Sequence, residues 1–87
     1  MSTKNVGFVT PSQCRAARAL LEMSQTDLAQ KAGLGLSTIV DFEKERRRLS
    51  QEAVSAIAGA LKREGITFIN ENGGGQGVRF RTPRKYK

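Results

Sequence analysis

The chain of 87 residues is poor in the side chains from which most catalytic and metal sites are built. It contains no histidine and no tryptophan, one cysteine, and only 6% aromatic residues. The single thiol, Cys14, excludes an internal disulfide, and we interpret it as a small core residue of a protein kept in a reducing compartment. Because the common zinc sites need several thiolates or imidazoles, we expect no metal and no cofactor.

Long apolar runs are also missing, since no stretch approaches the length of a membrane span or of a signal peptide. We therefore expect a soluble cytoplasmic protein without a membrane partner. Catalytic patterns are missing as well: the chain has no G-x-x-x-x-G-K-[ST] phosphate loop and no carboxylate pair placed for acid–base chemistry. The run Gly73–Gly75 is not a dinucleotide fingerprint, because no helix is expected to follow it. These absences predict that the protein is not an enzyme.

Positive charge is what the chain has in excess. Fifteen lysines and arginines against eight acidic residues give a net charge of +7, which is typical of proteins with a polyanionic partner. Five of the basic residues lie from Arg79 onward, where no acid occurs, so the first 78 residues are nearly balanced. We predict a flexible basic tail over residues 82–87, which either follows a DNA backbone or only keeps the chain soluble.

Apolar spacing and capping residues predict a helical domain over residues 11–65, after an N-terminal arm of residues 1–10. Thr10 and Pro11 mark the start of a first helix that runs to about residue 22. Ser24 caps a short second helix over about 25–32, a third covers about 37–44, and Ser50 caps a fourth that reaches about residue 64. The predicted core residues are Cys14, Ala17, Leu20, Leu21, Leu28, Ala32, Ile39, Phe42, Val54, Ile57, Ala58 and Leu61.

Two segments outside these helices alternate with a period of two. The arm has a brief alternation at Val6, Phe8 and Val9 that favours a short strand. Residues 66–81 predict an antiparallel hairpin around a glycine-rich loop. Since a lone hairpin is marginal in water, it must pack on the helices, pair with a second copy of the chain, or both. We predict that its apolar face dimerises through Ile66, Phe68, Val78 and Phe80.

The stretch from Gln25 to Phe42 is the one around which the chain is organised. Ala29 allows two helices to approach closely, and Gly33 suits the left-handed conformation of a tight helix exit. Ile39 is expected on the inward face of the next helix. Two short helices that meet at a sharp angle around such a glycine predict a helix-turn-helix, which places its second helix in the major groove of DNA.

The same stretch closely resembles the DNA-binding domain of phage Cro and repressor proteins, the Xre-type helix-turn-helix family. The residues that carry the resemblance are Ser24, Gln25, Leu28, Ala29, Ala32, Gly33, Leu34, Ser37, Thr38, Ile39, Phe42 and Glu43. The resemblance covers residues 11–66 and implies a mainly α, lambda-repressor-like bundle of four to five helices, here followed by a small C-terminal β-hairpin. The family normally has five helices, so its dimer interface is not carried over.

Two sets of DNA contacts are predicted. Base contacts are expected from Leu36, Ser37, Thr38, Val40 and Asp41 on the third helix. Phosphate contacts are expected from Gln25, Lys44, Arg46, Arg47 and Arg48; the role of Gln25 is implied by the resemblance. Ser37 serves alternatively as a helix cap, and Asp41 as a solvated acid. The resemblance also implies a structural ion pair between Arg18 and Glu43.

Together these features favour a sequence-specific transcriptional regulator that binds double-stranded DNA as a homodimer on an inverted repeat. The two recognition helices would enter successive major grooves, roughly 34 Å apart. An alternative is an adaptor or antitoxin-like protein that binds a protein partner through its hairpin. Non-specific nucleic-acid binding is a third interpretation. Whether the protein represses or activates stays open.

Overall fold

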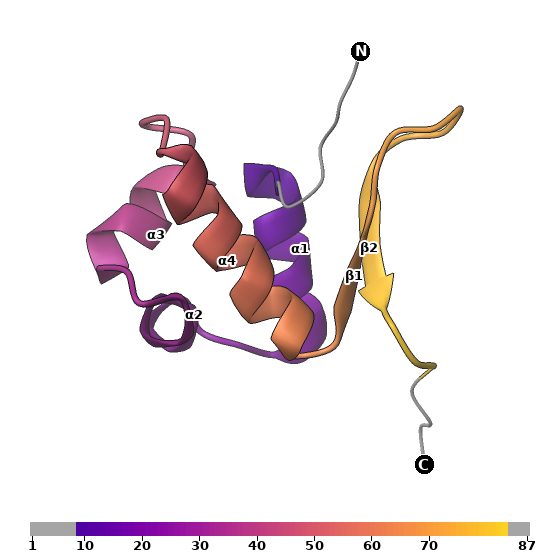
Figure 1. Cartoon of the computed structure of the whole chain (residues 1–87), viewed down its shortest axis with the longest axis horizontal. Helices are drawn as coiled ribbons and strands as arrows, with labels where there is room; N and C mark the ends of the chain where they lie inside the picture. Colours follow the sequence, from indigo (N-terminus) through magenta and orange to yellow (C-terminus); the bar gives the residue numbers. More distant parts are fainter. Residues whose placement is uncertain (1–8, 84–87) are drawn as a thin grey trace.

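The computed structural model describes residues 9–83 as four helices followed by a two-stranded antiparallel sheet (Figure 1). The elements are α1 (Pro11–Leu21), α2 (Gln25–Ala32), α3 (Leu36–Glu43), α4 (Gln51–Arg63), β1 (Ile66–Ile69) and β2 (Gly77–Phe80). This confirms the predicted mainly α bundle with a C-terminal hairpin. Each helix lies within one or two residues of its predicted bounds.

Three of the four helices begin at the residues predicted to cap them. The Thr10 hydroxyl accepts a hydrogen bond from the backbone N–H of Gln13, whose side chain accepts one from the N–H of Thr10, forming a capping box. Ser24 and Ser50 accept from backbone N–H groups in the first turns of α2 and α4. These caps are local in sequence, which is why the sequence alone locates them.

The first three helices are each followed by a residue with left-handed backbone conformation. These residues are Glu22, Gly33 and Glu45, with φ of 54°, 71° and 59°. In each case the next N–H returns to a carbonyl five positions earlier, the pattern of a Schellman motif. Gly33 was predicted to take this role. The two glutamates were not, because a left-handed non-glycine residue leaves no signal in the sequence, although it strains the backbone.

The core lies between the four helices and one face of the hairpin. Every helix contributes fully buried side chains, and the first strand adds one more. The largest apolar ones are Cys14, Leu28, Ile39, Ile57, Leu61 and Ile66. Burial of each large aliphatic side chain stabilises the fold by about 1.5–3 kcal/mol. One predicted core residue was wrong: Leu20 is 40% exposed, because it lies about 120° around α1 from Cys14.

The hairpin packs its apolar face on the helices of its own chain. Ile66 pairs with Phe80 and Phe68 with Val78, so all four point to one side, as predicted. Ile66 is 1% exposed and the other three pack against the core from α1 and α4. Packing on the helices therefore accounts for these residues. Dimerisation through the hairpin stays a prediction, and the face that remains for it carries Thr67, Ile69, Gly77 and Arg79.

A buried amide holds the loop end of the hairpin to α1. Gln13 is 4% exposed and its side-chain oxygen takes part in the capping box. Its side-chain nitrogen donates to the carbonyls of Ile69 (3.2 Å) and Gly77 (3.0 Å), the last cross-strand pair before the loop. Every polar atom of this buried side chain thus has a partner, which burial requires.

Two sequence expectations lie largely outside the described residues. The arm strand falls on residues 1–8, of which nothing is described, and only Val9, which is buried, belongs to the structure. The basic tail is described as far as residue 83. Over residues 9–83, none of the helices combines the length and the apolarity that crossing a membrane would take.

The turn between α2 and α3 yields a stability prediction. A Cβ atom at Gly33 would meet no atom within 4 Å, so Gly33→Ala changes only the strain of the left-handed backbone. We expect this substitution to lower the free energy of unfolding by about 1 kcal/mol. In a domain of this size, the melting temperature should fall by about 4–8 °C.

Gly74→Ala is the matched control, because Gly74 lies in the hairpin loop without a left-handed backbone, and a methyl group added there would meet no atom within 4 Å. It should leave the melting temperature unchanged or raise it slightly. Equal effects of the two substitutions would contradict the role given to Gly33.

Candidate nucleic-acid interface

Helices α2 and α3 form the predicted helix-turn-helix. Leu28 and Ala29 bury one face of α2, and Ile39 and Phe42 bury one face of α3. Ala29 is 4% exposed, as expected for the small residue that lets the helices approach closely. The chain turns at Gly33, and α3 starts after Gly35. The inward face of α3 is thus fixed by packing, which leaves its other face for a partner.

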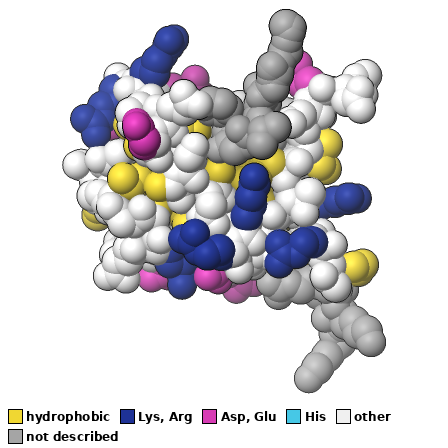
Figure 2. All heavy atoms as spheres, in the orientation of Figure 1, with side chains coloured by type: hydrophobic (Ala, Val, Ile, Leu, Met, Phe, Trp, Pro, Cys, Tyr) yellow, Lys and Arg dark blue, Asp and Glu magenta, His cyan; other side chains and the backbone are white. Residues whose placement is uncertain are grey.

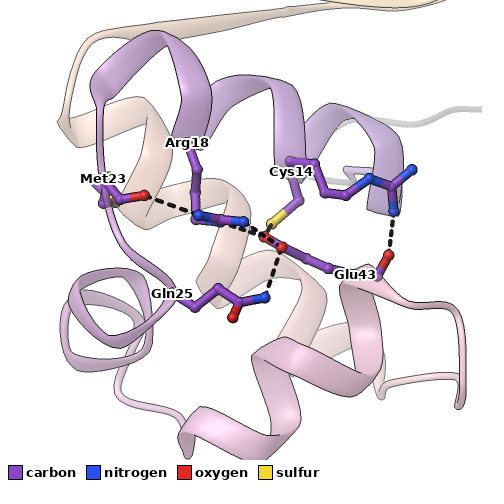
Figure 3. Close-up of polar contacts among 6 residues, drawn as sticks. Cys14, Arg18, Met23, Gln25 and Glu43 are labelled. Atoms are coloured by element: carbon purple, nitrogen blue, oxygen red, sulfur yellow. Dashed lines mark hydrogen bonds and ion pairs between the residues drawn. The ribbon is translucent and has the colours of Figure 1, made fainter.

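A buried carboxylate at the end of α3 ties this unit to α1 (Figure 3). Glu43, the last residue of α3, is 2% exposed. Arg18 of α1 donates to both of its carboxylate oxygens, each at 2.7 Å, and Gln25 of α2 donates to Oε1 at 3.0 Å. The Cys14 thiol donates to Oε2 at 3.1 Å. Three helices therefore meet at one carboxylate, and the ion pair implied by the family resemblance is present.

These contacts set the ionisation of the buried groups. Burial by itself raises the pKa of Glu43, but hydrogen bonds from Arg18, Cys14 and Gln25 and the charge of Arg18 outweigh it, so the net pKa lies below the ordinary value. Burial raises the pKa of the Cys14 thiol strongly, and its hydrogen bond to Glu43 raises it further. Cys14 therefore stays a neutral thiol and acts as a donor within the scaffold.

The exit of α3 is held by α1 and by a tight turn. Arg15 donates to the backbone carbonyl of Glu43, which would otherwise end the helix without a partner. The left-handed residue Glu45 then reverses the chain, and the N–H of Arg46 bonds to the carbonyl of Asp41 at 2.9 Å. This turn brings the arginines that follow α3 back alongside it. Neither Arg15 nor Glu45 was singled out in the sequence, since Arg15 bonds to a backbone carbonyl 28 positions away and Glu45 acts through its own backbone conformation.

The predicted base-contact residues of α3 differ in how far they are exposed. Leu36 is 47% exposed and Ser37 is also exposed, while Thr38, Val40 and Asp41 are half-buried. The N-cap of α3 is Gly35, with no side-chain hydrogen bond. The alternative in which Ser37 caps the helix is therefore wrong, and its hydroxyl remains available on the exposed face.

Basic side chains gather beside this face. Figure 2 shows lysine and arginine side chains projecting where Figure 1 places the loop between α3 and α4, and the residues there are Lys44, Arg46, Arg47 and Arg48. All four are exposed. Asp41 lies among them, with carboxylate oxygens 3.7 Å from Arg46 and 3.9 Å from Arg47. Arg47 also donates to the Thr38 hydroxyl at 2.9 Å.

Two predicted contact residues have partners inside the protein. The side-chain nitrogen of Gln25 is used by Glu43, so Gln25 first supports the scaffold, and its phosphate contact stays a prediction. Asp41 is not a free solvated acid, because two arginines flank it. Within residues 9–83, no three metal-ligating side chains come together. The surface available to a ligand is the outward face of α3, bordered by lysine and arginine side chains.

The carboxylate network yields a prediction on stability. Glu43→Ala leaves the guanidinium of Arg18, which is 20% exposed, without its ionic partner and opens a cavity in the core. We expect the free energy of unfolding to fall by about 2–4 kcal/mol, between the values for exposed and fully buried pairs. Thermal or urea denaturation measures the change.

The matched control is Glu64→Ala, which breaks the exposed pair between Lys31 and Glu64, 3.5 Å apart. Its effect should stay below about 1 kcal/mol, because both side chains are well hydrated. A loss for Glu43→Ala no larger than that for Glu64→Ala would show that the network does not support the fold.

The network also yields a prediction on pH. Because the pKa of Glu43 is lower in the folded state than in the unfolded chain, the stability it contributes is present above about pH 4.3 and is lost as the pH falls through the folded value. The difference in free energy of unfolding between the natural chain and Glu43→Gln should therefore be largest near pH 7 and shrink below about pH 4. A difference that does not vary with pH would contradict this assignment.

Comparison with known proteins agrees with this geometry. A family model described as helix-turn-helix matches residues 15–67, more than half of the chain. The match begins within α1, contains all of α2, α3 and α4, and ends in β1, so most of the hairpin lies outside it. No curated protein matches the chain. With the α2–α3 geometry and the matched residues together, the chain belongs to the helix-turn-helix family of the Xre/Cro type, whose members are DNA-binding regulators.

Proposed function

We propose that the protein is a transcriptional regulator that binds an operator in double-stranded DNA through the major groove, as a homodimer on an inverted repeat. The observation that carries the proposal is the arrangement around α3: its inward face is buried, its outward face is free, and an exposed arginine loop borders it. Such a face fits a groove walled by phosphates. The family membership gives DNA binding; the operator and the dimer are the proposal.

The positive groups fit a positioning role. Lys44, Arg46 and Arg48 are exposed at the end of α3 and in the loop after it, where the DNA backbone would pass. The N-terminus of α2 supplies free backbone N–H groups beside Gln25 for a phosphate on the other side of the groove. Contacts of this kind set affinity and register but carry no sequence information.

Sequence information would come from the exposed turns of α3. Leu36 is a large apolar side chain left 47% exposed at the start of the helix, which suits contact with a thymine methyl group. Ser37 can donate or accept at a base edge, and Val40 offers a second apolar contact. These are short side chains with little discrimination each. Selectivity therefore rests on DNA shape and on two copies held at a fixed spacing.

The hairpin is the surface we propose for joining the two copies. Figure 1 places it on the far side of the helices from α3, so a partner there leaves the DNA-binding face free. Its outer face carries Ile69, which is 40% exposed, and Arg79. A pair joined in this way holds its two α3 helices at its outer ends. The half-site spacing in the operator, one helical turn of about 34 Å or a multiple of it, therefore tests the interface directly.

A second function is favoured by the same hairpin. Within the described part of the chain its two strands have no third strand beside them, and Ile69, the last residue of β1, is exposed. An extended segment of another protein could add to such an edge. In this alternative the protein is an adaptor or an antitoxin-like partner, and the helical domain carries the complex to DNA or serves as a platform.

The test begins with selection of bound sites from random double-stranded DNA. A selected duplex and a random one are then compared by fluorescence anisotropy over a salt series, with sedimentation giving the number of protomers. We expect two protomers per selected duplex and an affinity at least about a thousandfold above that for random DNA. A ratio near one would indicate non-specific binding. A monomer indifferent to DNA would support the adaptor.

A charge-matched pair of variants locates the DNA face. Arg48→Ala should weaken binding to all sequences alike and lower the slope of log affinity against log salt by roughly one. Lys62→Ala removes the same charge from the opposite end of α4, roughly 17 Å from its start, and should leave that slope unchanged. Equal slopes for the two variants would place the DNA elsewhere.

A further inference from the structure

The outward face of α3 has no long polar side chain that could contact a base edge, but the loop after it supplies one. Resting on the proposed function, we propose that Arg47 reads a guanine in the major groove, held against α3 by Thr38 and Asp41, and that Asp41 positions Arg47 instead of contacting a base itself. The sequence groups Arg47 with its neighbours as a phosphate contact. Its hydrogen bond to Thr38 separates it from them, since Asp41 lies near Arg46 as well as Arg47.

The backbone brings Arg47 over the helix. α3 ends at Glu43, and the left-handed residue Glu45 turns the chain sharply enough for the N–H of Arg46 to bond to the carbonyl of Asp41. Residue 47 therefore follows a reversal of the chain, and its side chain reaches Thr38 and Asp41 of α3. An extended exit from the helix would have carried it away. This turn is why a residue of the loop reaches a side chain in the middle of the recognition helix.

Two side chains of α3 then hold the guanidinium. Arg47 donates through Nη2 to the Thr38 hydroxyl at 2.9 Å, and its Nε lies 3.9 Å from Asp41 Oδ2. Thr38 and Asp41 are three residues apart, so they lie on the same face of the helix. Both are half-buried, whereas Arg47 stays 52% exposed. The arginine is oriented by the helix and still reachable from solvent.

The remaining donors match a guanine edge. A guanidinium has five N–H groups in a planar fork, and the contacts to Thr38 and Asp41 involve two of them. The others are left for a ligand, enough for a bidentate contact with the O6 and N7 acceptors of guanine. A side chain already held in place loses less freedom on binding than a free one.

The neighbouring charge argues against a phosphate. A phosphate bound to Arg47 at this place would lie close to the carboxylate of Asp41, which repels it. A guanine edge carries no net charge, and its paired cytosine presents an N4 donor that tolerates a carboxylate. The same acid lies 3.7 Å from Arg46, so among the loop arginines Arg48, for which the described residues show no ion pair, is the best placed for a phosphate contact.

Site selection from random DNA tests this with the natural chain, Arg47→Ala, Arg47→Lys, Arg48→Ala and Asp41→Asn. The natural chain should select a guanine at one position of each half-site. Arg47→Ala should lower the preference for that guanine by roughly tenfold to a hundredfold and leave the other positions unchanged. Arg47→Lys keeps the charge but loses the fork, so the preference should fall while the salt slope stays the same. Arg48→Ala should keep the selected sequence.

Three results would overturn the inference, and they are distinguishable. If Arg47→Ala weakens all sequences alike and lowers the salt slope by roughly one, as Arg48→Ala does, Arg47 contacts phosphate. If Asp41→Asn removes a preference that Arg47→Ala leaves intact, Asp41 is itself the reader. If the natural chain selects no sequence at all, the proposed function fails first. Melting temperatures of all variants, which change only exposed or half-buried groups, confirm that they fold.

Discussion

The carboxylate of Glu43 is the constraint on which the rest of the structure depends. It is the last residue of α3, yet its partners come from α1 and α2, so one buried charge fixes three helices relative to one another. A buried carboxylate without donors would cost several kcal/mol, and this one is supplied by a bidentate guanidinium, an amide and a thiol. Because these donors have set directions, the angle at which α3 leaves the core is set as well. The buried contacts of Glu43 therefore determine the orientation of the exposed face of α3.

Much of the fold is predictable from the sequence because its signals are local. The caps at Thr10, Ser24 and Ser50, the turn at Gly33 and the change of period at the hairpin each depend on a few neighbouring residues. Leu20 is different, because its exposure depends on which part of the α1 surface the other elements cover. The same holds for Cys14, which has the pattern of an ordinary small core residue but donates to a carboxylate 29 positions away.

The candidate site was predictable as a set of residues but not as an arrangement. The sequence predicted Leu36, Ser37, Thr38, Val40 and Asp41 on the outward side of the third helix, with the arginines directly after it, and the structure leaves all of them exposed or half-buried there. Their contacts with DNA stay a prediction. The sequence did not indicate that Asp41 and Arg47 face each other, because the turn that brings them together is made by Glu45, a residue type with no preference for that conformation. Gln25 shows the converse: a residue expected at the ligand also serves the interior.

Gln13 fixes the register of the hairpin strands, which the hairpin's own sequence does not fix. Short strands beside a glycine-rich loop can slip by one residue, which would turn the apolar face outward. The Gln13 amide bonds to two carbonyls at once, one on each strand, and a slip of either strand would take one of them out of reach. The same side chain closes the capping box of α1. The register of the strands and the start of α1 are thus both fixed by one side chain, and Gln13, like most of the hairpin that it aligns, lies outside the matched residues 15–67.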